Sequence, residues 1–151
     1  MADGPTLTIP QATLTLPTDG PDADGWQFTR SSRLQLASAA FTLPDDDIAS
    51  VSVTLDTANI GGPLTLADFA ERDDESVGGI ALRRLDDRTV DGRLMYVKTG
   101  ADGDERVTEA GRVVDEAAGG IVGVSLTTRR LPAARHDALV DDLLDSLTWS
   151  E

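Results

Sequence analysis

Residues 92–128 read GRLMYVKTGADGDERVTEAGRVVDEAAGGIVGVSLTT, and this stretch decides the fold class. It divides into three extended segments, at about 92–98, 106–115 and 121–128. In the last of them, Val122, Val124 and Leu126 alternate with glycine, serine and threonine, as in a strand with one buried face. The joins are short and rich in Asp and Gly, so they cannot hold a crossover helix. The stretch therefore predicts an antiparallel meander.

Further strands are predicted on the N-terminal side. The clearest is 51–55, where Val51, Val53 and Leu55 alternate with Ser and Thr. The acidic run Asp45-Asp46-Asp47 precedes it and reads as a loop. The other predicted strands are 6–9, 13–16, a segment that contains Trp26 and Phe28, 33–43, and 80–85.

Two helices are predicted. Thr65 is a good N-cap with Asp68 three residues later, and an apolar face follows, so the first helix runs from Thr65 to Gly78-Gly79. The second spans about 132–147, with Pro132 in the first helical position. Its apolar stripe consists of Leu139, Val140, Leu143, Leu144 and Leu147.

A strand meander, one inserted helix and one terminal helix predict an α+β domain rather than an alternating α/β one. Because 151 residues suit one domain, we expect a single domain over 1–151. The absence of Cys excludes disulfides and thiolate chemistry.

The charge is strongly negative, with 27 acidic against 13 basic residues and a net charge of −14. Such a field repels phosphate backbones, so no nucleic-acid partner is expected. Lys98 is the only lysine, which fits a compositional bias toward Arg and Asp. We interpret the acidity first as a contribution to solubility, and second as attraction to a basic partner.

No apolar stretch approaches the roughly 20 residues of a membrane span. The segment Met1-Ala2-Asp3-Gly4-Pro5 lacks the features of a signal peptide. The expected location is therefore cytoplasmic, although a mature extracytoplasmic domain whose leader has been removed would look the same.

The motifs that touch on catalysis all have simpler interpretations. His136, the only histidine, lies between Arg135 and Asp137 and is expected to be a solvated surface residue rather than a member of a Ser-His-Asp system. The run 123–127 (GVSLT) lacks the final Gly of a nucleophile elbow, and 118–123 (AGGIVG) is followed by a strand rather than a helix. We therefore predict neither a catalytic serine nor a dinucleotide loop.

The remaining candidates for binding residues are two acidic clusters and the two tryptophans. Asp45-Asp46-Asp47 and Asp102-Gly103-Asp104-Glu105 lack the spacing of a calcium loop, so they are interpreted as solvated turns. Trp26 and Trp149 are expected to pack at the ends of the sheet with each indole N–H bonded, or alternatively to anchor a partner. No catalytic, cofactor or metal residue is predicted.

The order of elements resembles the PsbP-like group, which includes the Ran-binding Mog proteins, the DcrB-like bacterial proteins and a set of secretion-effector chaperones. The resemblance covers about Leu14 to Trp149 and rests on four short pieces. These are a strand that ends in Pro17 and leads to Gly25-Trp26, the helix Thr65–Ala70, the hairpin entry Val90-Asp91-Gly92, and the helix end Ser146-Leu147-Thr148-Trp149. It implies an antiparallel sheet of about six or seven strands flanked by helices in a three-layer α/β/α sandwich. The segment Arg30–Pro44 matches nothing in the group, and the first residues do not read as the lipoprotein or lumenal leader that many secreted members carry.

The resemblance also implies a function without catalysis, because adaptors, assembly factors and chaperones recur in this group. We therefore expect a protein-binding module, an adaptor or chaperone, which in its secretion-associated form would be a homodimer with an apolar groove. The alternatives are an extracytoplasmic assembly or lipoprotein-type domain, a carboxylate-based hydrolase, and a structural subunit. The partner and its binding face stay open.

Overall fold

The computed structural model describes residues 6–16, 27–31, 36–43, 46–59, 61–72 and 80–150, and the side chains of 6–16, 50–59, 61–71 and 80–150. The strands are β1 (Thr6–Ile9), β2 (Ala12–Thr15), β3 (Gln27–Ser31), β4 (Leu36–Leu43), β5 (Asp46–Asn59), β6 (Arg83–Arg84), β7 (Arg88–Val90), β8 (Arg93–Asp102), β9 (Glu105–Asp115), β10 (Gly120–Arg129) and β11 (Thr148–Trp149). The helices are α1 (Leu66–Arg72) and α2 (Ala133–Ser146).

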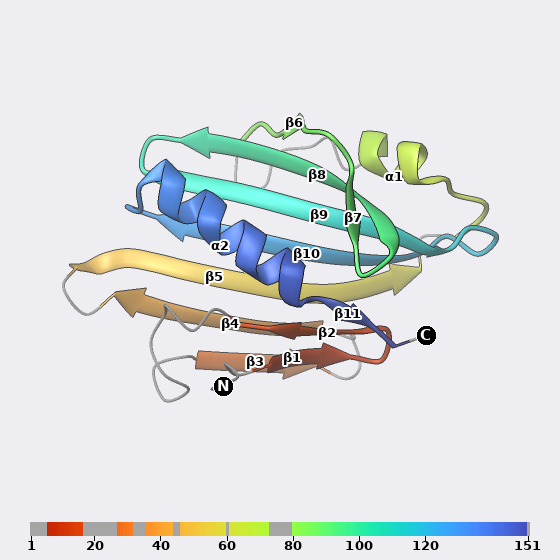
Figure 1. Ribbon diagram of the computed structural model, residues 1–151, viewed down its shortest axis with the longest axis horizontal. Coiled ribbons are helices and arrows are strands. Elements are labelled where there is room, and N and C mark those ends of the chain that lie inside the picture. Colours follow the sequence, from red (N-terminus) through yellow and green to blue (C-terminus); the bar gives the residue numbers. More distant parts are fainter. Residues whose placement is uncertain are drawn as a thin grey trace.

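A large antiparallel sheet forms the centre of the described structure (Figure 1). Its order is β3-β4-β5-β10-β9-β8-β6, and β7 also pairs with β8. The predicted meander is confirmed as β8-β9-β10, which continues through β10–β5 pairing. Two tight turns join neighbouring strands: Asp91-Gly92 between β7 and β8, where both residues have positive φ as in a type I′ hairpin, and Gly103-Asp104 between β8 and β9, where Gly103 has φ 62°.

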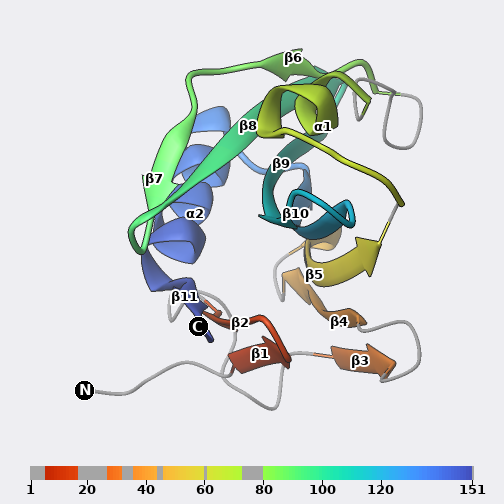
Figure 2. The same cartoon turned by 90° about the vertical axis from the view of Figure 1, so that its right-hand side faces the viewer.

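The main core lies between this sheet and α2. Side chains of one parity from β5, β9 and β10, such as Val53, Ala110 and Val124, meet Leu139 and Leu143 of α2. We call this the α2 face of the sheet. The lower part of the same face is covered by β1 and β2, whose buried residues belong to the same core (Figure 2).

The opposite face, the α1 face, carries a second and smaller cluster. The Phe69 ring of α1 meets the Tyr96 ring of β8 edge to face, with centroids 5.0 Å apart at 88°. Thr65 caps α1 as predicted, because its Oγ1 accepts from the Asp68 N–H at 3.1 Å. The remainder of the predicted helix, toward Gly78-Gly79, lies outside the described residues.

Residues 80–90, which we call the strap, cross the edge of the sheet from one face to the other. Ile80 and Leu82 pack with Val107 on the α1 face, and β6 then pairs with β8. Gly100 of β8 permits this crossing, because a Cβ there would collide with the Ala81 carbonyl. β7 follows and pairs with the first half of β8. The predicted strand 80–85 is therefore wrong in its extent, since only two of its residues are in β6.

The small sheet β1-β2-β11 joins the two ends of the described chain. Its Trp149 ring lies against the main core, and its Nε1 donates to the Val90 carbonyl at 2.9 Å. The Arg112 guanidinium lies 4.5 Å from the ring centroid. The packed, hydrogen-bonded interpretation of Trp149 is thus confirmed, whereas Trp26 lies outside the described residues.

The described residues confirm an α+β fold dominated by antiparallel sheet, but they do not establish the helix-flanked three-layer sandwich. Among the described residues, the helix on one face is the seven-residue α1, and the other face is shared by α2 and a second sheet. The predicted loop at Asp45-Asp46-Asp47 is wrong in part, because Asp46 and Asp47 belong to β5 while Asp45 lies outside the described residues. The join predicted between the segments 92–98 and 106–115 shrinks to a two-residue turn, since β8 continues to Asp102 and β9 begins at Glu105.

Candidate functional site

Two glycines inside neighbouring strands leave a hollow in the α1 face. Gly123 of β10 lies between Asp56 of β5 and Gly111 of β9 in the hydrogen-bonded register. Gly123 supplies no side chain, so the sheet surface above it is unfilled, whereas the space above Gly111 is occupied by the Tyr96 and Phe69 rings. The resulting hollow has a volume of about 200 Å³. We call it the α1-face hollow; it is lined by Thr54, Asp56, Thr57, Ala58, Phe69, Tyr96, Glu109, Ile121, Gly123, Val124 and Ser125.

One wall of the hollow is aromatic. Tyr96 is paired with Gly111 across β8 and β9, and a Cβ at Gly111 would overlap the rings of both Tyr96 and Phe69. The missing side chain therefore allows these two rings to lie close to the sheet. Tyr96 is 1% exposed and Phe69 is 7% exposed, which fixes the wall by packing.

The floor and the far side of the hollow are polar. Glu109, Ser125 and Thr54 are consecutive partners across β9, β10 and β5. Glu109 Oε1 accepts a hydrogen bond from the Tyr96 hydroxyl at 3.1 Å. Asp56 contributes a second carboxylate from β5, so two acidic side chains flank β10 in one concave surface. The hollow thus presents hydrogen-bond acceptors beside an aromatic wall.

The only lysine lies next to this wall. Lys98 is 1% exposed and is paired with Glu109 across β8 and β9. Its Nζ lies 5.7 Å from the centroid of the Tyr96 ring. Lys98 therefore has a structural place that its interpretation as compositional bias missed.

His136 corrects a prediction, because it is buried rather than solvated. It is 1% exposed and lies on the α2 face, where Nδ1 is 2.7 Å from Thr128 Oγ1 and Nε2 is 2.8 Å from Thr108 Oγ1. Burial lowers its pKa below the ordinary 6.5, with Asp137 acting in the opposite direction and Arg106 in the same one. The helical spacing could have indicated this burial, because His136 lies three and seven residues before Leu139 and Leu143, on the apolar side of α2.

The hydrogen bonds around His136 determine which nitrogen carries the proton. Thr99 Oγ1 donates its only proton to the Val107 carbonyl at 3.1 Å, so it must accept from Thr108 Oγ1, which is 3.0 Å away. Thr108 has then used its proton and accepts from His136 Nε2–H. Nδ1 consequently accepts from Thr128. The imidazole is neutral, with its proton on Nε2, and neither nitrogen is bonded to a carboxylate, as a catalytic triad would require.

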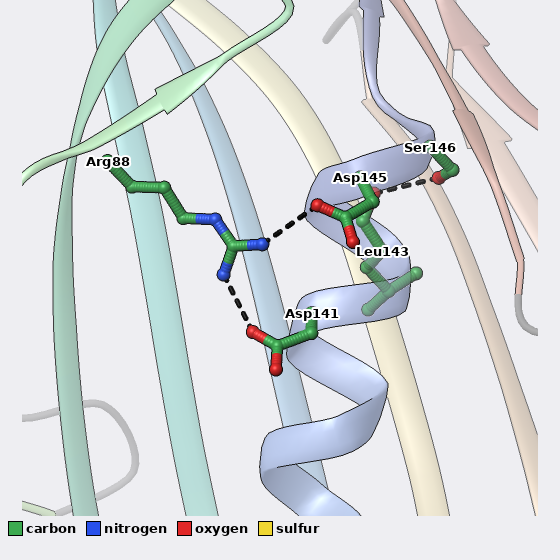
Figure 3. A network of polar contacts seen from close by, with 5 residues as sticks. All are labelled: Arg88, Asp141, Leu143, Asp145 and Ser146. Carbon is green, nitrogen blue, oxygen red and sulfur yellow. Dashed lines mark hydrogen bonds and ion pairs between the residues drawn. The ribbon is translucent and has the colours of Figure 1, made fainter.

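An ion-pair clamp ties the strap to α2 (Figure 3). The Arg88 guanidinium donates to Asp141 Oδ1 at 2.7 Å and to Asp145 Oδ1 at 3.0 Å. Burial lowers the pKa of Arg88, but the bonds to both carboxylates raise it by more, so the net shift is upward. On the next turn, Ser146 Oγ donates to the Leu143 carbonyl within α2. The clamp spans one turn of the helix and keeps Arg88 charged.

The remaining motifs that the sequence analysis discussed lie in an ordinary strand and in turns. Residues 123–127 are inside β10, and 116–119 form the turn before it. Asp102-Gly103-Asp104-Glu105 forms the β8–β9 turn, and Glu105 pairs with Arg129 at 3.2 Å. Within the described ranges, no group of His, Asp and Glu is arranged to hold a metal ion. Neither described helix has the length and apolar character of a membrane span.

Sequence reasoning missed the α1-face hollow altogether. The available signal was the pair of glycines inside alternating strands, at Gly111 and Gly123, because an interior strand glycine often marks a place where something approaches the backbone closely. Nothing in the sequence shows that the two glycines are aligned across β9 and β10, since this depends on the register.

Comparison with known proteins gives a likeness of fold. No family model matches the chain, and no curated protein matches it. Among solved structures, the chain is similar to the crystal structure of LpqN, described as involved in cell envelope biogenesis of Mycobacterium tuberculosis. The likeness has a TM-score of 0.61 and 16% identity, and it covers 93% of this chain and 84% of that one. At this identity it shows the fold alone, so membership of the PsbP-like group stays a resemblance.

Proposed function

We propose that this domain is a non-catalytic protein-binding module that docks a partner segment at the α1-face hollow. The observation that carries the proposal is the hollow itself, since it combines a fixed aromatic wall of Phe69 and Tyr96 with a polar floor. Recognition surfaces of this kind use an aromatic side of a pocket for affinity and a few polar groups for orientation. The domain would then act as an adaptor or chaperone.

The chemistry of the hollow indicates a basic partner segment. Asp56 and Glu109 both line it, and the whole chain carries a net charge of −14. A lysine or arginine side chain would place its donors against these carboxylates and its stem along Phe69 or Tyr96. The negative field would also accelerate the encounter with a basic protein.

The position of His136 supports a role without catalysis. The only histidine is buried on the face opposite the hollow and is held by two threonines. One observation favours a carboxylate-based hydrolase as the second candidate: Asp56 and Glu109 line the same hollow. Yet one oxygen of Glu109 is already occupied, because Glu109 Oε1 accepts a hydrogen bond from the Tyr96 hydroxyl.

The cellular setting follows from the likeness of fold only as part of this proposal. Because LpqN is described as involved in cell envelope biogenesis, the extracytoplasmic version of the module gains support over the cytoplasmic one. Separating the fractions of the native cell and detecting this protein in each would decide between them. A purely cytoplasmic signal would leave the secretion-associated adaptor as the surviving form.

The experiment that tests the proposal compares two matched variants in co-purification from the native cell. Gly123→Val fills the hollow, and its first carbon meets only the flexible end of Asp56. Thr127→Val adds similar apolar character on the same face of β10, four residues away and outside the hollow. We expect Gly123→Val to reduce recovery of the specific partner about tenfold or more, and Thr127→Val to leave it unchanged.

Two results would contradict this proposal. Equal recovery with both variants would place the partner elsewhere on the molecule. A hydrolytic activity of the purified wild-type protein that is lost in Asp56→Asn would favour the carboxylate-based hydrolase instead.

A further inference from the structure

A separate cavity lies on the α2 face, under the strap. It has a volume of about 290 Å³. Its floor is formed by Val97 and Thr99 of β8 and Thr108 of β9, and its side by Val140 of α2. Residues of the strap and two aspartates of α2 complete it: Arg83, Leu85, Asp86, Arg88, Asp137 and Asp141. We call it the strap cavity, and nothing in the proposed protein-binding function uses it.

The hydroxyl groups on its floor can only accept further hydrogen bonds. The Thr99 hydroxyl donates its hydrogen bond to the Val107 carbonyl, and the Thr108 hydroxyl donates its hydrogen bond to Thr99 Oγ1. Each hydroxyl oxygen has two lone pairs, of which one is already occupied: by Thr108 at Thr99, and by His136 Nε2–H at Thr108. One lone pair is left on each. A ligand that reaches this floor must therefore bring N–H or O–H donors.

The charges around the cavity favour a cation among such donors. Arg88 of the strap brings a positive charge to the cavity, but its two terminal nitrogens already bind Asp141 and Asp145 of α2 (Figure 3). Arg83 is exposed in the two-residue β6, where its guanidinium can remain in water. Asp86 and Asp137 supply two further carboxylates, both exposed at the rim. The lining thus has three carboxylates against two guanidinium groups, inside a chain of net charge −14.

The rest of the cavity surface suits a short apolar group. Val97 is 6% exposed and Val140 is half-buried, while Leu85 is 37% exposed and leans over the same space. Apolar groups on a ligand would remove this surface from water. At about 290 Å³, the cavity is near the lower limit of ordinary ligand pockets, which suits a small molecule.

We propose that the strap cavity binds a small primary-amine cation, whose ammonium group donates to Thr99 and Thr108 and faces Asp137, and whose alkyl part lies against Val97 and Val140. The site is on the opposite face of the sheet from the α1-face hollow. It therefore stands or fails independently of the proposed protein-binding function.

The test uses His136 as an internal probe, since its ring signals are those of the only histidine. The full-length protein is titrated with propylammonium chloride while the ring nitrogen and carbon resonances of His136 are followed by NMR. Tetramethylammonium chloride at the same ionic strength is the control, because it carries the charge but has no N–H donor. We expect saturable shifts with propylammonium and none with tetramethylammonium. Equal shifts with both salts would overturn the proposal.

A matched pair of charge variants tests the position of the site. Asp137→Asn and Asp142→Asn each remove one exposed carboxylate from α2, but only Asp137 lines the cavity. We expect Asp137→Asn to weaken propylammonium binding about fivefold and Asp142→Asn to change it less than twofold, as for a single partly exposed ion pair. Equal weakening by both variants would indicate attraction to the net charge alone and would contradict a site.

The floor hydroxyl is tested by a second pair. Thr99→Ser keeps the acceptor, whereas Thr99→Val removes it from a strand position that tolerates valine. Binding of propylammonium is expected to survive in Thr99→Ser and to fall about tenfold in Thr99→Val. Unchanged binding in Thr99→Val would refute the assignment of the ammonium group to this floor.

Discussion

The ring of Tyr96 lies over Gly111, its direct partner in the β8–β9 register, in space that any other residue would fill with its Cβ. The two residues are thus complementary: the glycine is required by the ring, and the ring covers the backbone that the glycine exposes. The same relationship brings the Tyr96 hydroxyl to Glu109 and shapes the wall of the α1-face hollow.

Gly111→Ala should destabilise the domain by about 1–3 kcal/mol, because an added methyl in packed surroundings forces both aromatic rings to move. Urea unfolding measures the change. Gly123→Ala is the matched control in the neighbouring strand, since its methyl meets only the Asp56 carboxylate end, and it should change stability by less than about 0.5 kcal/mol. Equal effects of the two substitutions would contradict the close ring contact.

His136 should make stability depend on pH below neutrality. Its pKa is lowered in the folded state from an ordinary 6.5, so the unfolded chain binds the proton more tightly. The resulting stability is present in full above pH 6.5 and is lost as the pH falls toward the folded pKa, by up to about 1.4 kcal/mol per pH unit. Urea unfolding of wild type and His136→Gln between about pH 7.5 and 5.5 measures this. The variant should be less stable at the upper pH, and the difference between the two proteins should shrink as the pH falls. A constant difference would contradict a neutral, locked imidazole.

The Arg88 clamp should contribute modestly and in a salt-dependent way. Its partners Asp141 and Asp145 are 65% and 75% exposed, so each ion pair belongs to the weak, screened class. Arg88→Gln should cost about 1 kcal/mol at low salt and less at high salt. Arg84→Gln removes the local pair with Asp87 and should cost less, because that pair joins neighbours within the strap. Thermal unfolding at two ionic strengths compares them. Equal losses of stability in the two variants, with the same dependence on salt, would contradict a stabilising role of the contact between the strap and α2.

Added salt should stabilise the whole domain. A net charge of −14 repels itself in the compact state, and the Debye length falls from about 10 Å at 0.1 M salt to about 3 Å at 1 M. The melting temperature should therefore rise with KCl and flatten once screening is complete. Sucrose at matched osmolality is the control for general exclusion effects. A melting temperature that falls with KCl would show that attractive ion pairs outweigh the repulsion.

The sequence predicted the antiparallel meander because its alternation and turns are local. Asp91-Gly92 and Gly103-Asp104 set the hairpins, and Thr65 sets the start of α1. The sequence could not predict the hollow or the two threonine partners of His136, because both depend on contacts between distant residues. Thr108 and Thr128 come from neighbouring strands, and only the β9–β10 register together with the docking of α2 makes them a pair of ligands for one imidazole.

The pairing of β2 with β11 has a consequence for how the nascent chain folds. Thr13 pairs with Thr148, and Ser146 Oγ accepts a hydrogen bond from the Thr15 amide at 3.1 Å, across a separation of 131 residues. The hairpin β1-β2 therefore cannot complete its sheet until the residues after α2 have left the ribosome. A hairpin alone is only marginally stable in water. The small sheet is therefore expected to form last during synthesis. On a ribosome stalled before Ser146, β1 and β2 would still lack β11 as their pairing partner.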